Sequence, residues 1–225
     1  MKTYTLITFS LFFNGLIIAQ KFTSLNFGKI PSQDLSLTEC PFEKGAEAMV
    51  LDETCEIYIA FIQGVPTYYY EVHKRIKIFN QAGFDQGQVN LDYINKIENI
   101  SNINAQVIQT DGTITKLKDD NIFTEKITEK KYRKKIAFPN LQSGSIIEYK
   151  YKLKSEKIYV LREWYFQKSI PTRNSQVIIK PEESLTYTPL IQQSLRVYQQ
   201  DGFYLAQNLE SIRKVPYFDR PQDHA

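Results

Sequence analysis

Two cysteines and two histidines are the side chains of this sequence that could serve as nucleophile and general base. A cysteine hydrolase or transglutaminase needs a thiolate, a histidine within hydrogen-bonding reach and usually an orienting carboxylate or amide. Sequence order allows Cys55 to act with His73, whereas His224 stands next to the last residue. His73 lies in a strand-like stretch and is expected to face solvent. Neither cysteine opens a helix, the usual arrangement that lowers a thiol pKa, so we predict no catalytic residue.

The two cysteines could instead form a disulfide if the chain is exported. Residues 46–51 are typical of a strand, and residues 52–54 are typical of a turn. At about 3.3 Å per residue, this arrangement places Cys40 and Cys55 roughly 15–20 Å apart. The Cα atoms of a disulfide lie only about 4.4–6.8 Å apart. A bridge would require residues 40–45 to fold back along the strand, so the pairing is disfavoured but stays open.

No motif indicates a metal or a cofactor. A metal centre needs clustered His, Cys or carboxylates at ligand spacing, which two distant histidines and two separated cysteines do not provide. Asp119 and Asp120 fit a polar loop end better than a calcium site. No GxGxxG or Walker sequence occurs. A glycosidase would need a pair of carboxylates, and no spacing singles out two of them. We therefore predict neither cofactor nor metal.

Residues 126–135 (KITEKKYRKK) form a strongly basic run. Such a run could bind anionic lipid, nucleic acid or an acidic glycan. Glu125 and Glu129 partly balance its charge, which favours a solvated loop leading into a strand. The net charge of +3 is also too small to indicate a nucleic-acid-binding protein.

Two aromatic triplets, Tyr-Tyr-Tyr at residues 68–70 and Trp-Tyr-Phe at residues 164–166, could form a platform for stacking sugars. In a strand, neighbouring side chains point to opposite faces, so only part of each triplet can line one surface. Packing within and around a core is therefore favoured over a glycan platform.

Stretches of alternating apolar and polar residues must position these side chains. The 15 Tyr and 14 Phe favour strands. Residues 65–79 alternate with basic residues on one side, which indicates an antiparallel strand with that side in water. Residues 145–153 repeat the pattern. Its expected core set is Ile147, Tyr149 and Tyr151, and its expected solvent set is Glu148, Lys150 and Lys152.

Short strands with turns between them predict the fold class. Asp111-Gly112 and Asp201-Gly202 are hairpin signals, and residues 92–102 carry a weak helical tendency. We expect an all-β protein, an antiparallel β-sandwich with long strands and little helix. The further expected strands are residues 104–109, 113–118, 134–138, 160–167, 175–180, 195–199 and 203–207.

The first residues are typical of a secretory signal: Lys2, an apolar run over residues 6–18, and the small residue Ala19. The run is shorter than the roughly 20 residues that span a bilayer, and a membrane anchor is the alternative. We expect an exported chain, periplasmic, associated with the outer membrane or extracellular, with no transmembrane segment once mature. The predicted segments are a signal peptide (1–19), an irregular segment (20–45), a β-sandwich domain (46–212) and a polar, linker-like tail (213–225).

An ordered set of short sequences resembles a bacterial family called domain of unknown function 3857. No single piece is specific, but the order is, and the likeness covers roughly residues 46–189. The pieces are HKRIKIF (73–79), GF (83–84), INAQ (103–106), DG (111–112), KL (116–117), FPN (138–140), GSIIEYKY (144–151), WYFQ (164–167) and IP (170–171).

The resemblance implies a β-sandwich domain that precedes a papain-like transglutaminase domain in exported bacterial proteins. The family has no agreed catalytic residues to carry over. We therefore expect a non-catalytic structural or interaction domain, here without the downstream catalytic domain. Its expected partners are a transglutaminase-like domain or a cell-envelope protein or polymer, and not nucleic acid. A stand-alone cell-surface module that binds glycan or peptide is the alternative, and a hydrolase with unrecognised carboxylates is a weaker third.

Overall fold

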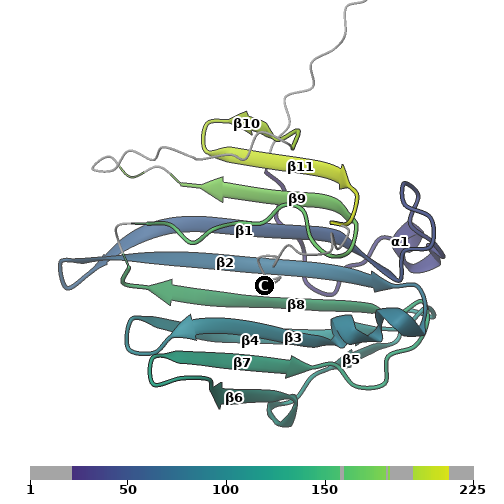
Figure 1. The fold of residues 1–225 in the computed structure, drawn as a ribbon, viewed down its shortest axis with the longest axis horizontal. Helices are drawn as coiled ribbons and strands as arrows, with labels where there is room; N and C mark the ends of the chain where they lie inside the picture. Colours follow the sequence, from purple (N-terminus) through teal and green to yellow (C-terminus); the bar gives the residue numbers. More distant parts are fainter. Residues whose placement is uncertain (1–21, 158–159, 181, 183–194, 213–225) are drawn as a thin grey trace, which may run out of the picture.

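The computed structural model describes residues 22–157, 160–180, 182 and 195–212 (Figure 1). Strands dominate it, and the helical elements are short. The strands are β1 (Ala48–Ile62), β2 (Val65–Ile78), β3 (Gln88–Ile94), β4 (Glu98–Ile108), β5 (Ile114–Lys116), β6 (Ile122–Lys126), β7 (Lys131–Ala137), β8 (Ile146–Ser155), β9 (Thr172–Ile179), β10 (Tyr198–Gln200) and β11 (Phe203–Leu209). The helical elements are α1 (Ser32–Ser36), η1 (Gln81–Gly87) and η2 (Asp119–Asn121).

Two sheets pack face to face. The large sheet has eight strands in the order β10-β11-β9-β1-β2-β8-β4-β5, and the small sheet has the order β3-β7-β6. Val89, Leu91 and Ile136 of the small sheet share one buried cluster with Val72 and Tyr149 of the large sheet. The predicted β-sandwich is therefore confirmed. Among the described strands, β1 and β9 form a parallel pair within an otherwise antiparallel arrangement.

β1 runs on through the residues that were expected to form a turn, so that prediction is wrong. The polar residues stay in the strand because the neighbouring strand β9 supplies partners. Asp52 accepts a hydrogen bond from Arg173 at 3.0 Å, and Glu53 accepts one from Ser175 at 2.8 Å. A β-bulge between Val50 and Asp52 also shifts the alternation of the strand by one residue.

Two other expected elements are wrong. Residues 92–102, with their helical tendency, form the end of β3, a turn and the start of β4. Residues 160–167, expected as a strand, lie outside both sheets. Side-chain and backbone bonds hold this segment instead: the Arg162 N–H donates to the hydroxyl of Tyr70, and Trp164 Nε1 donates to Ser175 Oγ, both at 3.0 Å.

The outer face of the large sheet, turned away from the small sheet, is partly covered by residues 22–45. α1 lies beside one end of β1 and β2 (Figure 1), and Leu35 and Leu37 pack against Met49 and Ile146. The prediction that this face is wet is therefore wrong at this end. Covering the face removes water from polar residues of β2 and β8, namely His73, Arg75, Lys77 and Glu148.

Both Asp-Gly hairpins are confirmed. Asp111 accepts a hydrogen bond from the Thr113 N–H at 2.8 Å in the β4–β5 turn. In the β10–β11 turn, Asp201 and Gly202 have φ values of 48° and 78°. Two successive positive φ values are typical of a type I′ turn, which matches the twist of the joined strands.

Some predictions lie outside the described residues: the signal peptide of residues 1–19, the polar tail of residues 213–225, and His224 within that tail. In the described part, every helical element is too short to span a membrane.

Candidate functional site

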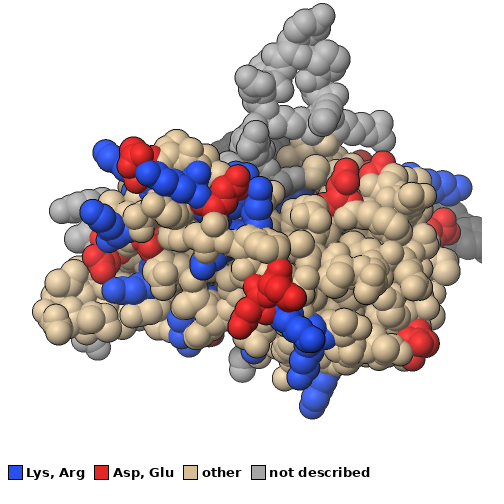
Figure 2. Space-filling model, turned by 90° about the horizontal axis from the view of Figure 1, so that it is seen from below, with Lys and Arg blue, Asp and Glu red and all other residues tan. Residues whose placement is uncertain are grey.

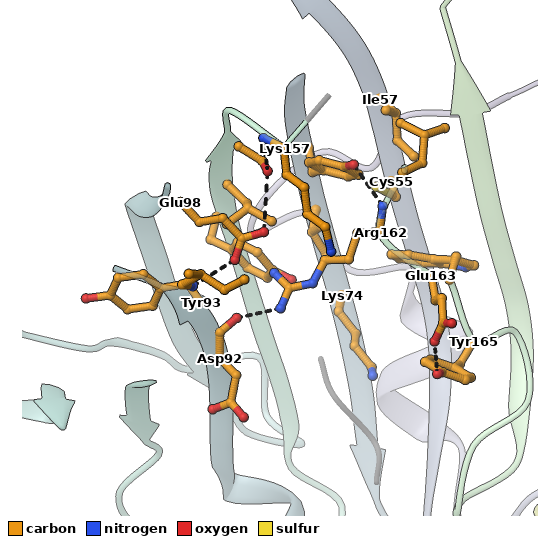
Figure 3. Close-up of a pocket in the computed structure, with 18 of the residues that line it drawn as sticks. Cys55, Ile57, Lys74, Asp92, Tyr93, Glu98, Lys157, Arg162, Glu163 and Tyr165 are labelled. Carbon is orange, nitrogen blue, oxygen red and sulfur yellow. Dashed lines mark hydrogen bonds between the residues drawn. The ribbon is translucent and has the colours of Figure 1, made fainter. Parts of the chain in front are cut away.

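A cavity of about 470 Å³ lies between the two sheets (Figure 3). Its floor is the inner face of β1, β2 and β8, and its other walls come from β3, the start of β4 and the segment 160–168. Strand alternation makes the floor apolar, because one side of each strand faces the core. The floor residues are Cys55, Ile57, Tyr70, Val72, Tyr149, Tyr151 and Leu153. The volume is within the range of about 300–1,000 Å³ that small-molecule sites occupy.

Glu53 lines the cavity and is 1% exposed. Its carboxylate lies 3.1 Å from Lys168 Nζ and 3.4 Å from Lys74 Nζ, and it accepts a hydrogen bond from Ser175. Burial opposes ionisation, but the charges of Lys168 and Lys74 outweigh it and lower the pKa of Glu53. Glu53 is therefore ionised near neutral pH and has no proton to give as a general acid.

Asp92 of β3 stands on the opposite wall. Arg133 of β7 donates to it from Nε at 2.5 Å and from Nη2 at 3.0 Å, and Lys131 Nζ lies 2.8 Å away. Desolvation raises the pKa of Asp92, but the bonds to Arg133 and Lys131 outweigh it and lower the pKa to about 2. This bidentate pair ties β3 to β7 and fixes one wall of the cavity.

Replacing Asp92 by asparagine is expected to remove stability in a pH-dependent way. The pKa falls from 3.8 to about 2 on folding, so the contribution is present above about pH 4 and is lost as the pH falls through about 2. We expect Asp92→Asn to lower the free energy of unfolding by about 2 kcal/mol at about pH 5. The two proteins should converge below about pH 2.

Urea denaturation of both proteins across this pH range measures the difference. Asp120→Asn is the matched control, since Asp120 is exposed in η2. A constant difference between wild type and Asp92→Asn from about pH 5 to 2 would show that the Asp92 carboxylate does not titrate with a lowered pKa.

The remaining carboxylates of the cavity also have partners, whereas two of its cations have no carboxylate partner among the described residues. Glu98 accepts hydrogen bonds from the Ile94 N–H at 2.8 Å and from a serine hydroxyl at 3.4 Å. Glu163 accepts one from the hydroxyl of Tyr165 (Figure 3). Within the described ranges, no carboxylate lies within 4.0 Å of the side-chain nitrogens of Lys157 or Arg162.

The structure does not bring Cys55 and His73 together. Cys55 pairs with Val72 across β1 and β2, and His73 is the next residue of β2. The two side chains therefore point to opposite faces of the sheet. Cys55 lies in the core, where burial raises the pKa of its thiol. His73 is 8% exposed rather than solvent-facing, and its Nε2 lies 2.8 Å from Glu148 Oε1.

Cys40 and Cys55 are both free thiols. Cys40 belongs to the buried cluster under residues 22–45, on the outer face of the large sheet, together with Met49 and Leu51. Cys55 belongs to the cluster between the two sheets. The large sheet therefore stands between them, so they form no disulfide in this structure.

The basic run is mostly neutralised by its neighbours, as the solvated-strand interpretation requires. Lys126 pairs with Glu129 at 2.6 Å, and Lys135 pairs with Glu125 at 2.7 Å. Seen from the side of β6, Asp and Glu side chains lie among the Lys and Arg side chains (Figure 2). Asp119 and Asp120 lie in η2, and no cluster of three potential metal ligands occurs within the described part of the chain.

The triplet at residues 68–70 divides between core and surface, and Trp164 and Phe166 of the second triplet pack against the core cluster. Tyr68 and Tyr70 are buried in the core, and Tyr69 points to the outer face, as strand alternation predicts. There its ring stacks on Tyr58 with centroids 5.3 Å apart, and Lys152 Nζ lies 5.7 Å from the Tyr69 centroid.

Sequence reasoning missed Glu53, Lys168 and Arg162 as residues of the cavity. A signal for one of them existed: Glu53 stands on the same side of its strand as the apolar residues Cys55 and Ile57. A charged residue in an apolar row is costly to bury unless it is paired. No comparable local signal marks Arg162, because the segment that carries it belongs to neither sheet.

The fold and the cavity define a β-sandwich domain with an internal cavity between its sheets. The family model for a domain of unknown function with a solved structure, DUF3857, matches residues 66–202, more than half of the sequence. The chain belongs to this family. Among curated proteins, no match is found.

A solved structure with a TM-score above 0.5 supports the fold. A putative protease from Parabacteroides distasonis is 14% identical with a TM-score of 0.58, and the match covers 80% of this chain and 39% of that protein. Leukotriene A4 hydrolase from Saccharomyces cerevisiae is 11% identical with a TM-score of 0.35, covering 72% and 27%. A nutrient binding protein from Legionella pneumophila, also described as putative, is 13% identical with a TM-score of 0.33, covering 73% and 63%.

Proposed function

We propose that this chain is a non-catalytic interaction domain of an exported protein, and that its inter-sheet cavity holds a ligand without transforming it. One observation carries the proposal: the thiol of the cavity and its two ion-paired carboxylates are unsuited to nucleophilic or acid–base catalysis. The Cys55 thiol is buried with a raised pKa, and Glu53 and Asp92 are ion-paired with lowered pKa values. Acid–base catalysis works best with a group whose pKa lies near the operating pH.

The proposed partner is a transglutaminase-like catalytic domain or a cell-envelope polymer. The resemblance to exported proteins of this family supports it, and so does the apolar run at residues 6–18, which is typical of a signal peptide. The similar Parabacteroides protein is much longer than the region it shares with this chain, which covers 39% of it. A domain of this kind would orient a ligand or polymer toward a catalytic neighbour.

Activity assays on the full chain test the non-catalytic part of the proposal. We expect neither hydrolysis of a fluorescent casein substrate nor incorporation of a labelled amine above the blank, because the Cys55 thiol is buried and Glu53 and Asp92 are held in ion pairs. Papain and an active transglutaminase serve as positive controls. Turnover that disappears in Cys55→Ala, with the variant still folded by circular dichroism, would overturn the proposal.

The coding sequence after the codon for Ala225 tests the partner. A reading frame that continues into a segment carrying Cys, His and Asp in that order supports the transglutaminase-like domain. A stop codon directly after Ala225 removes that partner and leaves the envelope polymer.

A second candidate function is a surface module that binds a glycan. The stacked pair Tyr58 and Tyr69 favours it, since both rings lie on the outer face of the large sheet and both are partly exposed. Lys152 Nζ lies over both rings, and it also pairs with Glu71 at 2.7 Å. Aromatic rings flanked by charged groups suit the apolar faces and hydroxyls of a sugar.

A further inference from the structure

The side chains that line the inter-sheet cavity leave cations in excess. Four carboxylates line it, namely those of Glu53, Asp92, Glu98 and Glu163, against five cations. Each of these carboxylates accepts at least one bond from a described residue. Among the cations, Lys131 and Lys168 lie within 3.1 Å of a carboxylate, and Lys74 reaches one only at 3.4 Å. Every cavity carboxylate thus has a hydrogen-bond donor, whereas part of the positive charge has no carboxylate partner among the described residues.

Of the cations in the cavity, Arg162 is the best placed to bind an anionic ligand. Its backbone N–H donates to the Tyr70 hydroxyl at 3.0 Å, and its Nη2 donates to the carbonyl of Asp92 at 2.5 Å. These two bonds fix the side chain across the cavity (Figure 3). A guanidinium carries five N–H donors. Among the described residues, the Asp92 carbonyl is the one acceptor that the Arg162 side chain reaches. The guanidinium therefore keeps N–H donors that can bind a carboxylate with two parallel hydrogen bonds.

Lys157 supplies a second positive charge to the same cavity. Figure 3 shows its side chain extending from the rim into the cavity, where the Arg162 guanidinium also lies. Its backbone N–H bonds Ser155 Oγ at 3.2 Å, which holds the residue at the rim. The two cations together would bind a single anionic group at the opening of the cavity.

The apolar floor specifies the rest of the ligand. Tyr151 and Leu153 are buried, and Tyr93 stands at the edge of the facing sheet. A flat or branched apolar group fits such a surface and gains from leaving water. Glu98 and Glu163 line the same cavity and would repel a group with more than one negative charge, such as a phosphate monoester. The cavity therefore favours one carboxylate joined to an apolar or aromatic group.

We propose that the inter-sheet cavity binds a monoanionic ligand in which a carboxylate is joined to an apolar or aromatic group, with the carboxylate on Arg162 and Lys157. The proposal rests on the proposed function, because it takes the cavity as a site of binding without turnover. Two kinds of ligand carry such a carboxylate: a free organic acid and the C-terminal residue of a peptide chain.

Calorimetric titration of the full chain tests this site with matched probes. N-acetyl-L-phenylalanine carries the carboxylate, and N-acetyl-L-phenylalaninamide has the same shape without the charge. We expect the acid to bind at least about tenfold more tightly than the amide, since a charge-assisted bidentate bond is lost in the amide. The tripeptide N-acetyl-Ala-Ala-Phe, which is also monoanionic, separates the sources: tighter binding than the acid indicates a peptide terminus, and weaker or equal binding indicates a free acid.

Substitutions locate the binding. Arg162→Gln is expected to weaken binding of the acid by at least about tenfold and to leave the amide unchanged. Arg196→Gln is the matched control, because Arg196 is exposed and does not line the cavity. A changed thermal unfolding curve would show that Arg162→Gln loosens the segment that carries it. In that case Lys157→Gln gives the same test, because the Lys157 side chain makes no hydrogen bond to the described residues.

Three results would overturn the site: equal affinity for the acid and the amide, unchanged affinity in both Arg162→Gln and Lys157→Gln, or no heat of binding with the acid at about 10 mM. Chromatography of the recovered probes keeps this test separate from the proposed function. Probes that bind and are returned chemically altered would contradict the non-catalytic proposal while leaving the binding site intact.

Discussion

Replacing Tyr149 by alanine is expected to lower the free energy of unfolding by about 3–5 kcal/mol, the range for truncating a buried aromatic side chain. Tyr149 is 1% exposed and sits on the inner face of β8, between the two sheets. Its ring centroid lies 6.1 Å from that of Phe138, which follows β7. Truncation would remove contacts on both sides of the sandwich and leave a hole that the paired strands cannot close.

Urea denaturation followed by tryptophan fluorescence measures this loss, since Trp164 packs against the same core. Tyr149→Phe is the matched control, because it keeps the ring and changes only the hydroxyl, and we expect it to cost less than about 1.5 kcal/mol. A urea midpoint of Tyr149→Ala equal to that of wild type would show that Tyr149 does not belong to the core.

Replacing Glu148 by alanine is expected to cost a similar amount, about 3–5 kcal/mol, for an electrostatic reason. The Glu148 side chain is 0% exposed, and its Oε1 lies 2.8 Å from both His73 Nε2 and Arg75 Nε. Its Oε2 accepts bonds from the Gly28 N–H at 2.8 Å and from Gln106 at 2.5 Å. Without the carboxylate, the Arg75 guanidinium would stay buried without its counter-charge.

The same substitution should also release residues 22–28 from the sheet. Glu148 holds this segment through Gly28, and Arg75 Nη2 holds it through the Asn26 carbonyl at 2.5 Å. Hydrogen exchange would report the release as faster exchange of the Gly28 amide than in wild type.

Glu125→Ala is the matched control for Glu148→Ala. Glu125 is paired with Lys135 at 2.7 Å, but both side chains are more than 40% exposed. Such a surface pair contributes about 0–1 kcal/mol. Equal unfolding midpoints for the two variants would show that burial of Glu148 adds nothing, and would contradict a stabilising role for its buried network.

The alternation of β2 and β8 was readable from the sequence, and the residues it assigned to the core are the ones that pack between the sheets, Tyr149 and Tyr151 among them. The same alternation misassigned the other face. It placed His73 and Glu148 in water, because polar residues on one side of a strand normally mark a wet surface. Residues 22–45 cover that surface, and their sequence has no periodic pattern of apolar residues that would predict this covering role.

The turn expected at residues 52–54 failed for a related reason. Asp52 and Glu53 have low strand preference, but their carboxylates find partners on β9, more than a hundred residues later in the chain. Tertiary pairing therefore overrode local preference. The cavity depends on the same kind of contact, since Glu53, Asp92 and Arg162 come from β1, β3 and the segment before β9.

The sequence by itself determined the fold class, most of the strands, the two Asp-Gly hairpins and the family, because strand alternation and turn chemistry act over a few neighbouring residues. The tertiary structure alone decided which face of the large sheet is covered, on which face each cysteine lies, and which charged groups meet across the cavity. These features depend on contacts between residues far apart in the chain, and a buried charge is stable only where the fold brings a distant partner to it.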